Sequence, residues 1–286
     1  LYVNSMVREI SVDNDGKANG IIYINKEDNK EYKINAKVVV LAASACESAR
    51  ILLNSKSKYH ENGIGNSSNM VGKYLHDSTG TNNMAFIPDL MNRKTYNEDG
   101  MGNMHLYTPW WLDNKNLDFP RGYHIEVWGG LGAPAYGFGF NYNSLNKYFG
   151  IEIGGYGDRV REEVKKYYGS TIGFSTRGES VPNKNNYCDI DPEKKDKYGI
   201  PVLKFNYKWS DYERKQAKHM NETVKKIVHN IGGHMLWENG GPDNGLLTPG
   251  EVIHEVGTTR MGSNPKTSVV NEYEQLHDAK NVFIVD

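Results

Sequence analysis

The first 53 residues alternate apolar, strand-like segments with short polar turns. β-Branched and aromatic residues predict three strands, over Tyr2–Ile10, Gly20–Ile24 and Glu31–Ile34. The polar sequences Asp13–Gly16 and Asp28-Asn29 predict the turns between them. The next segment, Lys37–Leu41, is β-branched without alternation, which predicts a strand covered on both faces. A helix is predicted to follow, because Ser44 and Glu47 have the spacing of a capping box.

The middle of the chain, residues 81–175, is rich in Gly, Asn, Tyr and Trp and predicts an antiparallel sheet with long connections. The candidate strands here and just beyond are Asn83–Ile87, Tyr123–Gly129, Ser170–Thr176 and Val202–Tyr207. A long amphipathic helix is predicted from Ser210, which forms a second capping-box pattern with Glu213. Its apolar positions follow helical spacing: Ala217, Met220, Val224, Ile227, Val228 and Ile231. The pair Gly232-Gly233 is expected to end it.

Two short strands, Glu251–Val256 and Asn281–Asp286, are predicted towards the end of the sequence, with a tight loop at Gly257–Gly262 after the first. The sequence opens at Leu1 directly in a strand-like segment, and it stops flush with an apolar strand. Such strands normally lead into the element that covers them. We therefore expect this sequence to be an internal piece of a longer protein.

Composition and charge narrow the classes of partner. The 286 residues include 34 Lys and Arg against 35 Asp and Glu, so no basic excess exists to neutralise the phosphates of a nucleic acid. The longest apolar run, Val38–Ala43, is too short to cross a bilayer. Cys46 and Cys188 form no CxxC pair, and two free thiols are favoured over a disulfide.

The familiar motifs of metal and nucleophilic catalysis are missing from the sequence. None of the nine histidines stands at HxH or HxxxH spacing to another, so no metal site is predicted. His254-Glu255 opens like the HExxH motif of zinc proteases, but Thr258 occupies the place of the second histidine. The signatures GxSxG, GxxxxGK[ST] and GxGxxG are also absent. The segment densest in chemistry is Ile253–Gly262, where one histidine precedes a glycine-bounded polar loop; a histidine hydrogen-bonded in a domain interface is the alternative interpretation.

Four motifs, in order along the chain, resemble the glucose-methanol-choline (GMC) oxidoreductase family. Residues 41–53, LAASACESARILL, are similar to that family's LAAGA-x-x-S-x-x-LL, and residues 63–77, GIGNSSNMVGKYLHD, to its GxGNSS…VGxxLxDH. Residues 254–262, HEVGTTRMG, look like HxxGTxRMG. SVVN at 268–271 and NVFIVD at 281–286 look like SVVD…NLFVVD. The shared order makes the resemblance far more specific than any single motif.

This resemblance implies an FAD-dependent oxidoreductase that oxidises an alcohol and passes hydride to the flavin. It implies that His254 faces the flavin and accepts the hydroxyl proton, and an imidazole suits that role near neutral pH. Relatives with this form of the motif act on sugars, polyols or sugar acids, so a small-molecule alcohol or sugar is the expected substrate. The resemblance also allows a separate electron acceptor.

The resemblance implies four contacts with FAD. The Val7 backbone meets the adenine, Ala43 and Ser44 form the strand–helix turn beside the dinucleotide, and Asp286 lies near the pyrophosphate and ribityl chain. The alternative is that Val7 and Ala43 are ordinary packed strand residues with no contact to the cofactor. The sequence departs from the family in having Ser44 where glycine is common, and in having no histidine directly after Asp77.

The expected fold is α/β of mixed (α+β) type. It combines an incomplete Rossmann-like FAD-binding domain, over residues 1–80 and 249–286 with the catalytic loop, and a substrate-binding domain on an antiparallel sheet with helices over residues 81–248. The dinucleotide fingerprint GxGxxG and the second catalytic His or Asn of the family lie outside this sequence. We therefore expect the 286 residues alone neither to retain FAD nor to turn over substrate.

Aromatic residues in the middle of the chain leave the substrate class open. Tyr107, Trp110 and Trp111, with His105 and His124, form either stacking platforms for sugar rings or ordinary core packing. A catalytically silent carbohydrate-binding fragment, built from residues 81–210, is the alternative to an enzyme. An NAD-dependent enzyme is disfavoured, because the sequence contains no dinucleotide fingerprint.

Overall fold

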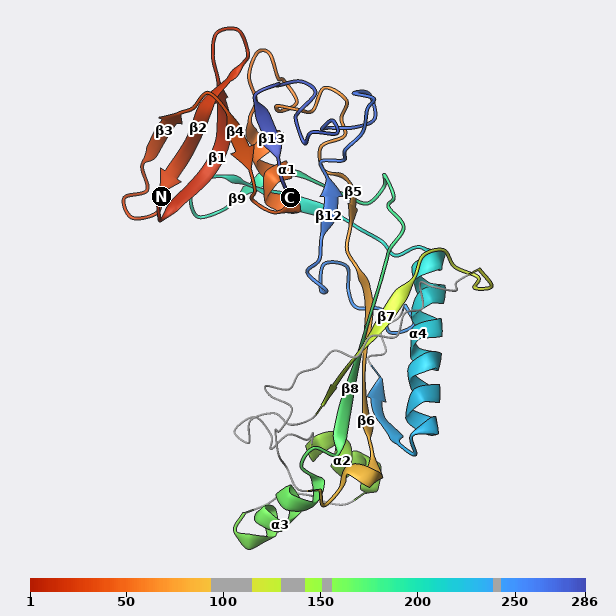
Figure 1. Ribbon diagram of the computed structural model, residues 1–286. Helices are drawn as coiled ribbons and strands as arrows, with labels where there is room; N and C mark the ends of the chain where they lie inside the picture. Colours follow the sequence, from red (N-terminus) through yellow and green to blue (C-terminus); the bar gives the residue numbers. More distant parts are fainter. Residues whose placement is uncertain (94–114, 130–141, 151–155, 239–242) are drawn as a thin grey trace. The chain divides into compact units, whose positions relative to one another are not determined.

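The computed structural model describes residues 1–93, 115–129, 142–150, 156–238 and 243–286 of the chain (Figure 1). The chain divides into two compact units, each assembled from separated segments. Unit 1 comprises residues 1–77, 182–208 and 254–286, and unit 2 comprises residues 78–181 and 209–253. The sequence-based division differs from these units in three segments: it placed residues 182–208 in the substrate-binding domain, and residues 78–80 and 249–253 in the FAD-binding domain.

Unit 1 begins with an antiparallel three-stranded sheet. Its strands are β1 (Ser5–Val12), β2 (Ala18–Asn25) and β3 (Glu31–Asn35), in the order β1-β2-β3. The three strands predicted from the sequence are thus confirmed, each within three residues of its predicted limits. Both connections are short polar turns, as the Asp- and Asn-rich sequences indicate.

A parallel pair of strands follows, and it corrects one prediction. β4 (Val39–Leu41) pairs with β13 (Val282–Ile284) in the register Val40↔Phe283. The non-alternating valine run predicted coverage on both faces, and this is wrong for the described residues: Val39 is 6% exposed but Val40 is 57% exposed. The reason is that β4 has β13 as its sheet partner and the unit 1 core packs against one face of that pair.

An antiparallel sheet built from segments far apart in the sequence completes unit 1. The four strands β10 (Pro201–Asn206), β9 (Tyr187–Lys195), β5 (Lys73–His76) and β12 (Val256–Thr258) lie side by side in that order. The strand predicted at Glu251–Val256 is wrong, because the paired residues are Val256 and Thr258, opposite His76 and Lys73. The glycine inside β12 is required, since a Cβ on Gly257 would lie 2.1 Å from the Tyr74 carbonyl oxygen.

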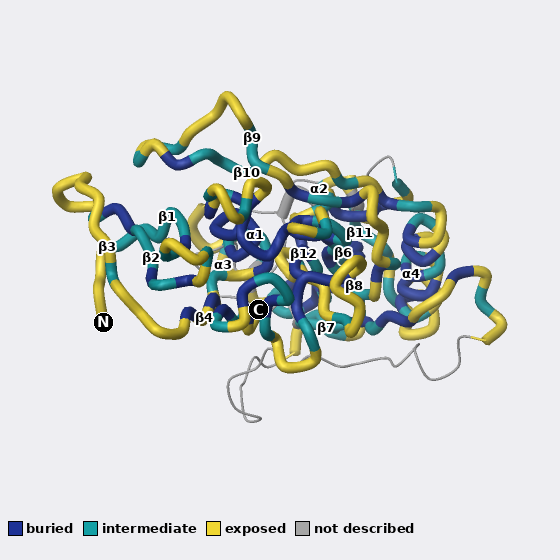
Figure 2. Tube along the Cα trace, turned by 90° about the horizontal axis from the view of Figure 1, so that it is seen from above, coloured by how far each residue is buried: buried dark blue, intermediate teal, exposed yellow. Residues whose placement is uncertain are grey.

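Helix α1 (Ala45–Asn54) lies at the centre of the unit 1 core (Figure 2). Its residues Ala49 and Leu52 have no exposed surface, and they pack with Leu276 and Val282 from the end of the chain. Burying aliphatic side chains from distant segments is what joins those segments into one unit.

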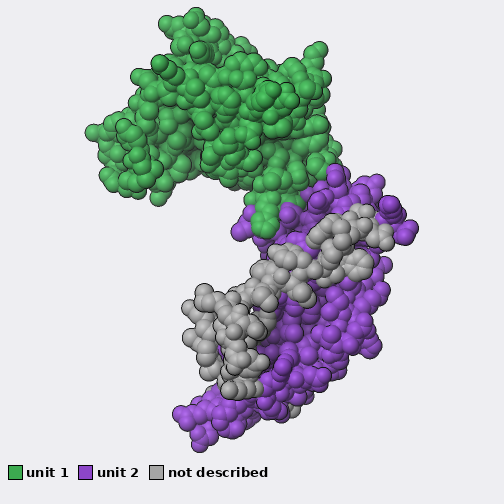
Figure 3. All heavy atoms as spheres, viewed as in Figure 1, with its two compact units in different colours: residues 1–77, 182–208, 254–286 green, residues 78–181, 209–253 purple. Residues whose placement is uncertain are grey.

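Unit 2, coloured purple in Figure 3, is an antiparallel sheet with a long helix against it (Figure 1). The sheet order is β11 (His234–Glu238), β6 (Thr79–Phe86), β8 (Thr171–Gly178) and β7 (Tyr123–Gly129). Helix α4 (Asp211–Asn230) starts at the predicted capping box, in which Ser210 and Glu213 bond each other's backbone and side chain. Its face of Ala217, Met220, Val224 and Val228 is buried, as the helical spacing predicts.

Short elements close one end of unit 2. They are the 3-10 turn η1 (Pro88–Leu90) and the helices α2 (Tyr142–Phe149) and α3 (Asp158–Tyr167). Phe86, Leu145 and Tyr167 form their shared buried cluster. In the part of the chain that the structure describes, no helix combines the length and apolarity that a bilayer crossing requires.

Candidate active site

The carboxylate of Asp286 ties the end of β13 to the start of α1. It accepts hydrogen bonds from the Ser44 backbone N–H, at 2.7 Å, and from the Ser48 hydroxyl. Ser48 Oγ in turn accepts the Ala43 N–H at 3.3 Å. Three of the sequence-predicted site residues, Ala43, Ser44 and Asp286, therefore belong to one hydrogen-bonded cluster.

The backbone of Ser44 corrects the prediction of a capping box with Glu47. Ser44 is the N-cap of α1, but its side chain makes no capping hydrogen bond. Its φ of 81° and ψ of 158° lie in a region that is essentially confined to glycine, whereas a capping side chain reaches the first turn from an extended backbone with negative φ. Instead, Asp286 and Ser48 satisfy the donors of this turn.

A buried threonine holds the HEVGTTRMG segment against the same turn. The Thr258 hydroxyl donates to the Ala45 carbonyl oxygen at 2.6 Å, and Thr258 has no exposed surface. The Thr258 carbonyl accepts the Gly72 N–H at 2.7 Å. Strand β12 is thus fixed beside the N-terminus of α1, one residue from Ser44.

His254 lies just before β12, with its side chain exposed in unit 1. Its backbone N–H donates to the Asp77 carboxylate at 2.9 Å, and Asp77 is only 1% exposed. His254 and Thr258 are four positions apart, which is at most about 14 Å of extended chain. The buried Asp77 carboxylate therefore fixes the position of the His254 backbone just before β12.

Ser48, Asp77 and Thr258 are the residues that sequence reasoning missed as contributors to the site. All three belong to segments that the motifs had singled out, but the motifs do not say which atoms bond. Val7, the remaining predicted residue, pairs with Tyr23 in the β1–β2 ladder and packs, partly buried, against the core that contains α1.

The predicted aromatic platform cannot be placed as a group. His105, Tyr107, Trp110 and Trp111 lie outside the described residues. His124 lies on β7 in unit 2, where its Nε2 is 3.0 Å from a carboxylate oxygen of Glu126. Within the described ranges, no cluster of three His, Cys, Asp or Glu side chains could hold a metal ion.

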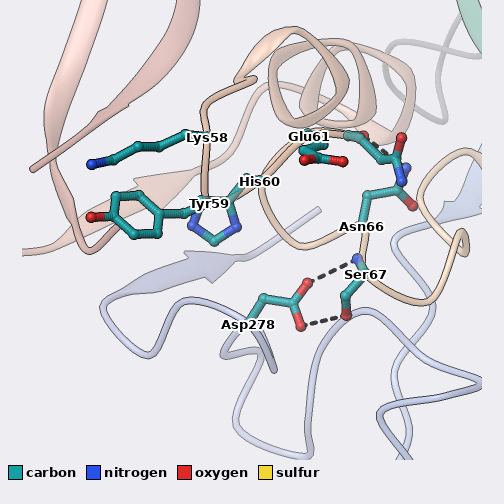
Figure 4. Close-up of a pocket in the computed structure, with 9 residues that line it drawn as sticks. Lys58, Tyr59, His60, Glu61, Asn66, Ser67 and Asp278 are labelled. Atoms are coloured by element: carbon teal, nitrogen blue, oxygen red, sulfur yellow. Dashed lines mark hydrogen bonds between the residues drawn. The ribbon is translucent and has the colours of Figure 1, made fainter. Parts of the chain in front are cut away.

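Unit 1 also contains a polar pocket of about 480 Å³, which the start of the GIGNSS motif helps to line (Figure 4). It is lined by residues 58–63 together with Asn66, Ser67 and Asp278. The Asp278 carboxylate accepts the Ser67 N–H at 3.0 Å and its hydroxyl at 2.7 Å, which closes one wall of the pocket.

The cluster around Asp286 suits a dinucleotide cofactor. β4 and β13 are parallel, so their carboxyl ends meet at one edge, where Ala43, Ser44 and Asp286 follow. Ligands of parallel sheets bind outside the carboxyl ends of the strands. A carboxylate has about four acceptor positions, so Asp286 keeps acceptors for ligand hydroxyls beyond the two bonds to Ser44 and Ser48.

Comparison with known proteins agrees with this geometry. Two sequence profiles described as GMC oxidoreductase match residues 1–79 and 182–286. The 2-methyl-1,2-propanediol dehydrogenase of Mycolicibacterium austroafricanum is 29% identical, over 100% of this chain and 49% of its own length. The fructose dehydrogenase large subunit of Gluconobacter japonicus is 25% identical, over 98% of this chain and 47% of its own length. The chain thus spans about half the length of these curated relatives.

Solved structures share the fold at low sequence identity. A FAD-dependent oxidoreductase from Chaetomium thermophilum matches 100% of this chain and 56% of its own, with a TM-score of 0.57 and 13% identity. A formate oxidase from Aspergillus oryzae matches 99% of this chain and 55% of its own, with a TM-score of 0.56 and 12% identity. From the two profile matches and the relatives together, the chain belongs to the GMC oxidoreductase family, whose cofactor is FAD.

Proposed function

We propose that the protein containing this chain oxidises a small alcohol, of the sugar, polyol or sugar-acid class, and that His254 accepts the hydroxyl proton. The observation that carries this proposal is the Thr258–Ala45 hydrogen bond, which holds the histidine-bearing segment beside the Ser44–Asp286 cluster. The substrate class is supported by relatives named for a diol and for fructose. A third is named for gluconate: the gluconate 2-dehydrogenase flavoprotein of Pantoea cypripedii, 31% identical over 45% of this chain and 21% of its own length.

His254 has the properties that a general base needs. Its imidazole is exposed in unit 1, so a substrate hydroxyl can reach it, while its backbone is fixed by the buried Asp77 carboxylate. Removing the hydroxyl proton raises electron density on the carbinol carbon, and hydride then leaves more readily. FAD, when bound, would supply the acceptor for that hydride. Asp77 is a positioning residue here, because it acts through the His254 backbone.

The cofactor contacts are part of the same proposal. Ala43 and Ser44 let the dinucleotide approach the small-residue turn, and Asp286 accepts hydrogen bonds from its hydroxyls. Val7 offers backbone atoms to the adenine. The support is the shared hydrogen-bonded cluster for the first three residues and, for Val7, its position in the ladder of β1.

The test is flavin reduction by substrate in the purified, FAD-containing protein without oxygen. A panel of polyols, hexoses and aldonic acids identifies the reductant, and His254→Ala is then compared with the natural sequence in stopped-flow absorbance. We expect the variant to reduce its flavin about 10²–10⁴-fold more slowly, with the absorption spectrum of bound FAD unchanged. His229→Ala, an exposed histidine on α4, is the matched control and should not change the rate. An unchanged rate in His254→Ala contradicts the assigned role.

A further inference from the structure

Two cysteines that lie 142 positions apart in the sequence meet in unit 1. Cys46 is in the first turn of α1, and Cys188 is in β9. Cys188 is only 1% exposed and belongs to the unit 1 core, against which the half-buried Cys46 packs. Both are free thiols, as the sequence predicts, and they belong to the same packed cluster of unit 1.

A chain of hydrogen bonds joins the two segments that carry the cysteines. The Cys188 N–H donates to the Gly72 carbonyl at 3.0 Å, and the Gly72 N–H donates to the Thr258 carbonyl at 2.7 Å. The Thr258 hydroxyl donates to Ala45, the residue before Cys46. A Cβ at Gly72 would lie 2.1 Å from the Cys188 carbonyl oxygen, so only glycine permits this approach. These bonds therefore bring the start of α1 and the Cys188 position of β9 together.

The two thiols differ in acidity and in access. The hydrogen bond from Cys188 lowers the pKa of Cys46, although burial and the nearby carboxylates of Glu255 and Glu47 oppose this. The pKa of Cys188 is raised by its hydrogen bond with Cys46 and by burial. The thiolate therefore forms first at Cys46, which is also the cysteine with solvent access, and a thiolate is the attacking species in disulfide exchange.

We propose that Cys46 and Cys188 form a thiol–disulfide exchange site that reacts with a low-molecular-weight disulfide. The Cys46 thiolate attacks one sulfur of the small disulfide RS–SR, which breaks the S–S bond, releases one RS⁻ and leaves a Cys46–SR mixed disulfide. Cys188, after losing its proton to solvent or to the released RS⁻, attacks the Cys46 sulfur and expels the second thiol. The net change is two protein thiols and one RS–SR converted into one protein disulfide and two RSH.

The product joins the first turn of α1 covalently to β9. The same turn carries the Thr258 bond and follows Ser44, so the cross-link forms beside the proposed cofactor turn. The exchange itself needs only the two cysteines and the hydrogen bonds that join their segments. The proposal is therefore independent of the alcohol-oxidising activity.

The test uses oxidised glutathione on the purified, FAD-containing protein. After blocking of remaining thiols, tryptic digestion without reductant yields residues 38–50 with Cys46 and residues 185–194 with Cys188. We expect these two peptides as one disulfide-linked species, which reductant separates. A glutathione adduct that persists on Cys46 in the natural sequence, or native thiols that fail to react, overturns the proposal.

Variants separate the two roles. Cys188→Ser should accumulate the Cys46 glutathione adduct, because no second thiol resolves it; Cys188→Ala serves the same purpose if serine disturbs the core. Cys46→Ser should leave Cys188 unmodified in the folded protein, because that thiol is buried. Rapid glutathionylation of Cys188 in Cys46→Ser contradicts the assigned order of attack.

Discussion

Ser44 holds a backbone conformation that residues with a Cβ rarely adopt, at the turn between β4 and α1. Its φ is 81° and its ψ is 158°, and its side chain caps nothing. Such conformations cost about 1–3 kcal/mol for a residue other than glycine. The Asp286 hydrogen bond holds the turn in this shape, and the GMC pattern commonly has glycine at this position. The strain is therefore a property of the residue rather than of the turn.

Ser44→Gly should stabilise unit 1. Relief of strain, less the greater freedom that glycine gives the unfolded chain, leaves a gain of about 1 kcal/mol in the free energy of unfolding. Urea unfolding measures it, with Ser44→Ala as the control that removes the hydroxyl but keeps the strain. Equal stability of the glycine and alanine variants would contradict this account.

The candidate site could be predicted only in part. His254 and Asp286 stand in motifs, so the sequence pattern marks both. Their neighbours follow from bonds between distant residues, such as Asp77 with His254 and Thr258 with Ala45, and no local pattern encodes which atoms meet. The contact between Cys46 and Cys188 is of the same kind, because it depends on how β9 and β5 align.

At the scale of elements, a buried arginine anchors α1 to the loop before β10. Arg50 is 9% exposed, and its guanidinium donates to the Asp196 carboxylate and to the Pro201 carbonyl, both at 2.8 Å. Burial alone would raise the pKa of Asp196, but the hydrogen bonds from Arg50, Ile200 and Tyr198 outweigh it and hold the pKa below its ordinary value. The ionised pair thus ties the helix to the sheet.

Asp196→Asn should destabilise unit 1 in a pH-dependent way. A carboxyl whose pKa is lowered by folding stabilises the protein above its unfolded pKa, and this contribution is lost as the pH falls through the folded value. We expect a loss of about 1–3 kcal/mol at pH 7, shrinking below about pH 4. Urea midpoints from pH 7 to pH 3 measure it, and Asp189→Asn, at an exposed carboxylate, is the control. A difference that stays constant to pH 3 argues against the linkage.

Elements with strong local signals were predictable, and those defined by their partners were not. The Ser210 capping box and the spacing of apolar residues located α4, and Ile231, predicted on its apolar face, is instead the C-cap and 44% exposed. β9 reads YCDIDPEKK, in which charges and a proline hide the strand; its pairing with β10 and β5 makes it one. β12 was not predicted for a similar reason, because its partner defines it. The Tyr74 carbonyl lies so close to Gly257 that no side chain fits at this position.

At the scale of the whole molecule, unit 1 depends on pairing between remote segments. The β1–β3 sheet needs only short turns, whereas β4 pairs with β13 from the other end of the chain. Closing a long loop costs more entropy and slows the formation of the contacts that depend on it. The local sheet and the parallel pair therefore should not form at the same time.

Refolding should protect the amides of β1–β3 before those that join β4 to β13. The reporters for the parallel pair are the Val39 N–H, bonded to the Asn281 carbonyl, and the Val285 N–H, bonded to the Leu41 carbonyl, both at 3.0 Å. Pulsed hydrogen exchange with mass spectrometry follows both sets in one experiment. Simultaneous protection of the two sets would show that unit 1 condenses in a single step.

The 242-residue separation between Ser44 and Asp286 has a consequence for synthesis on the ribosome. At about 5–20 residues per second, roughly 12–50 s pass between translation of these two positions. Throughout that interval β4 has been made but β13 has not. The edge of β4 that later pairs with β13 is therefore open to other nascent chains. A translational pause between the two codons would prolong this exposure. A chaperone that binds short valine-rich strands would protect β4 from other chains during it.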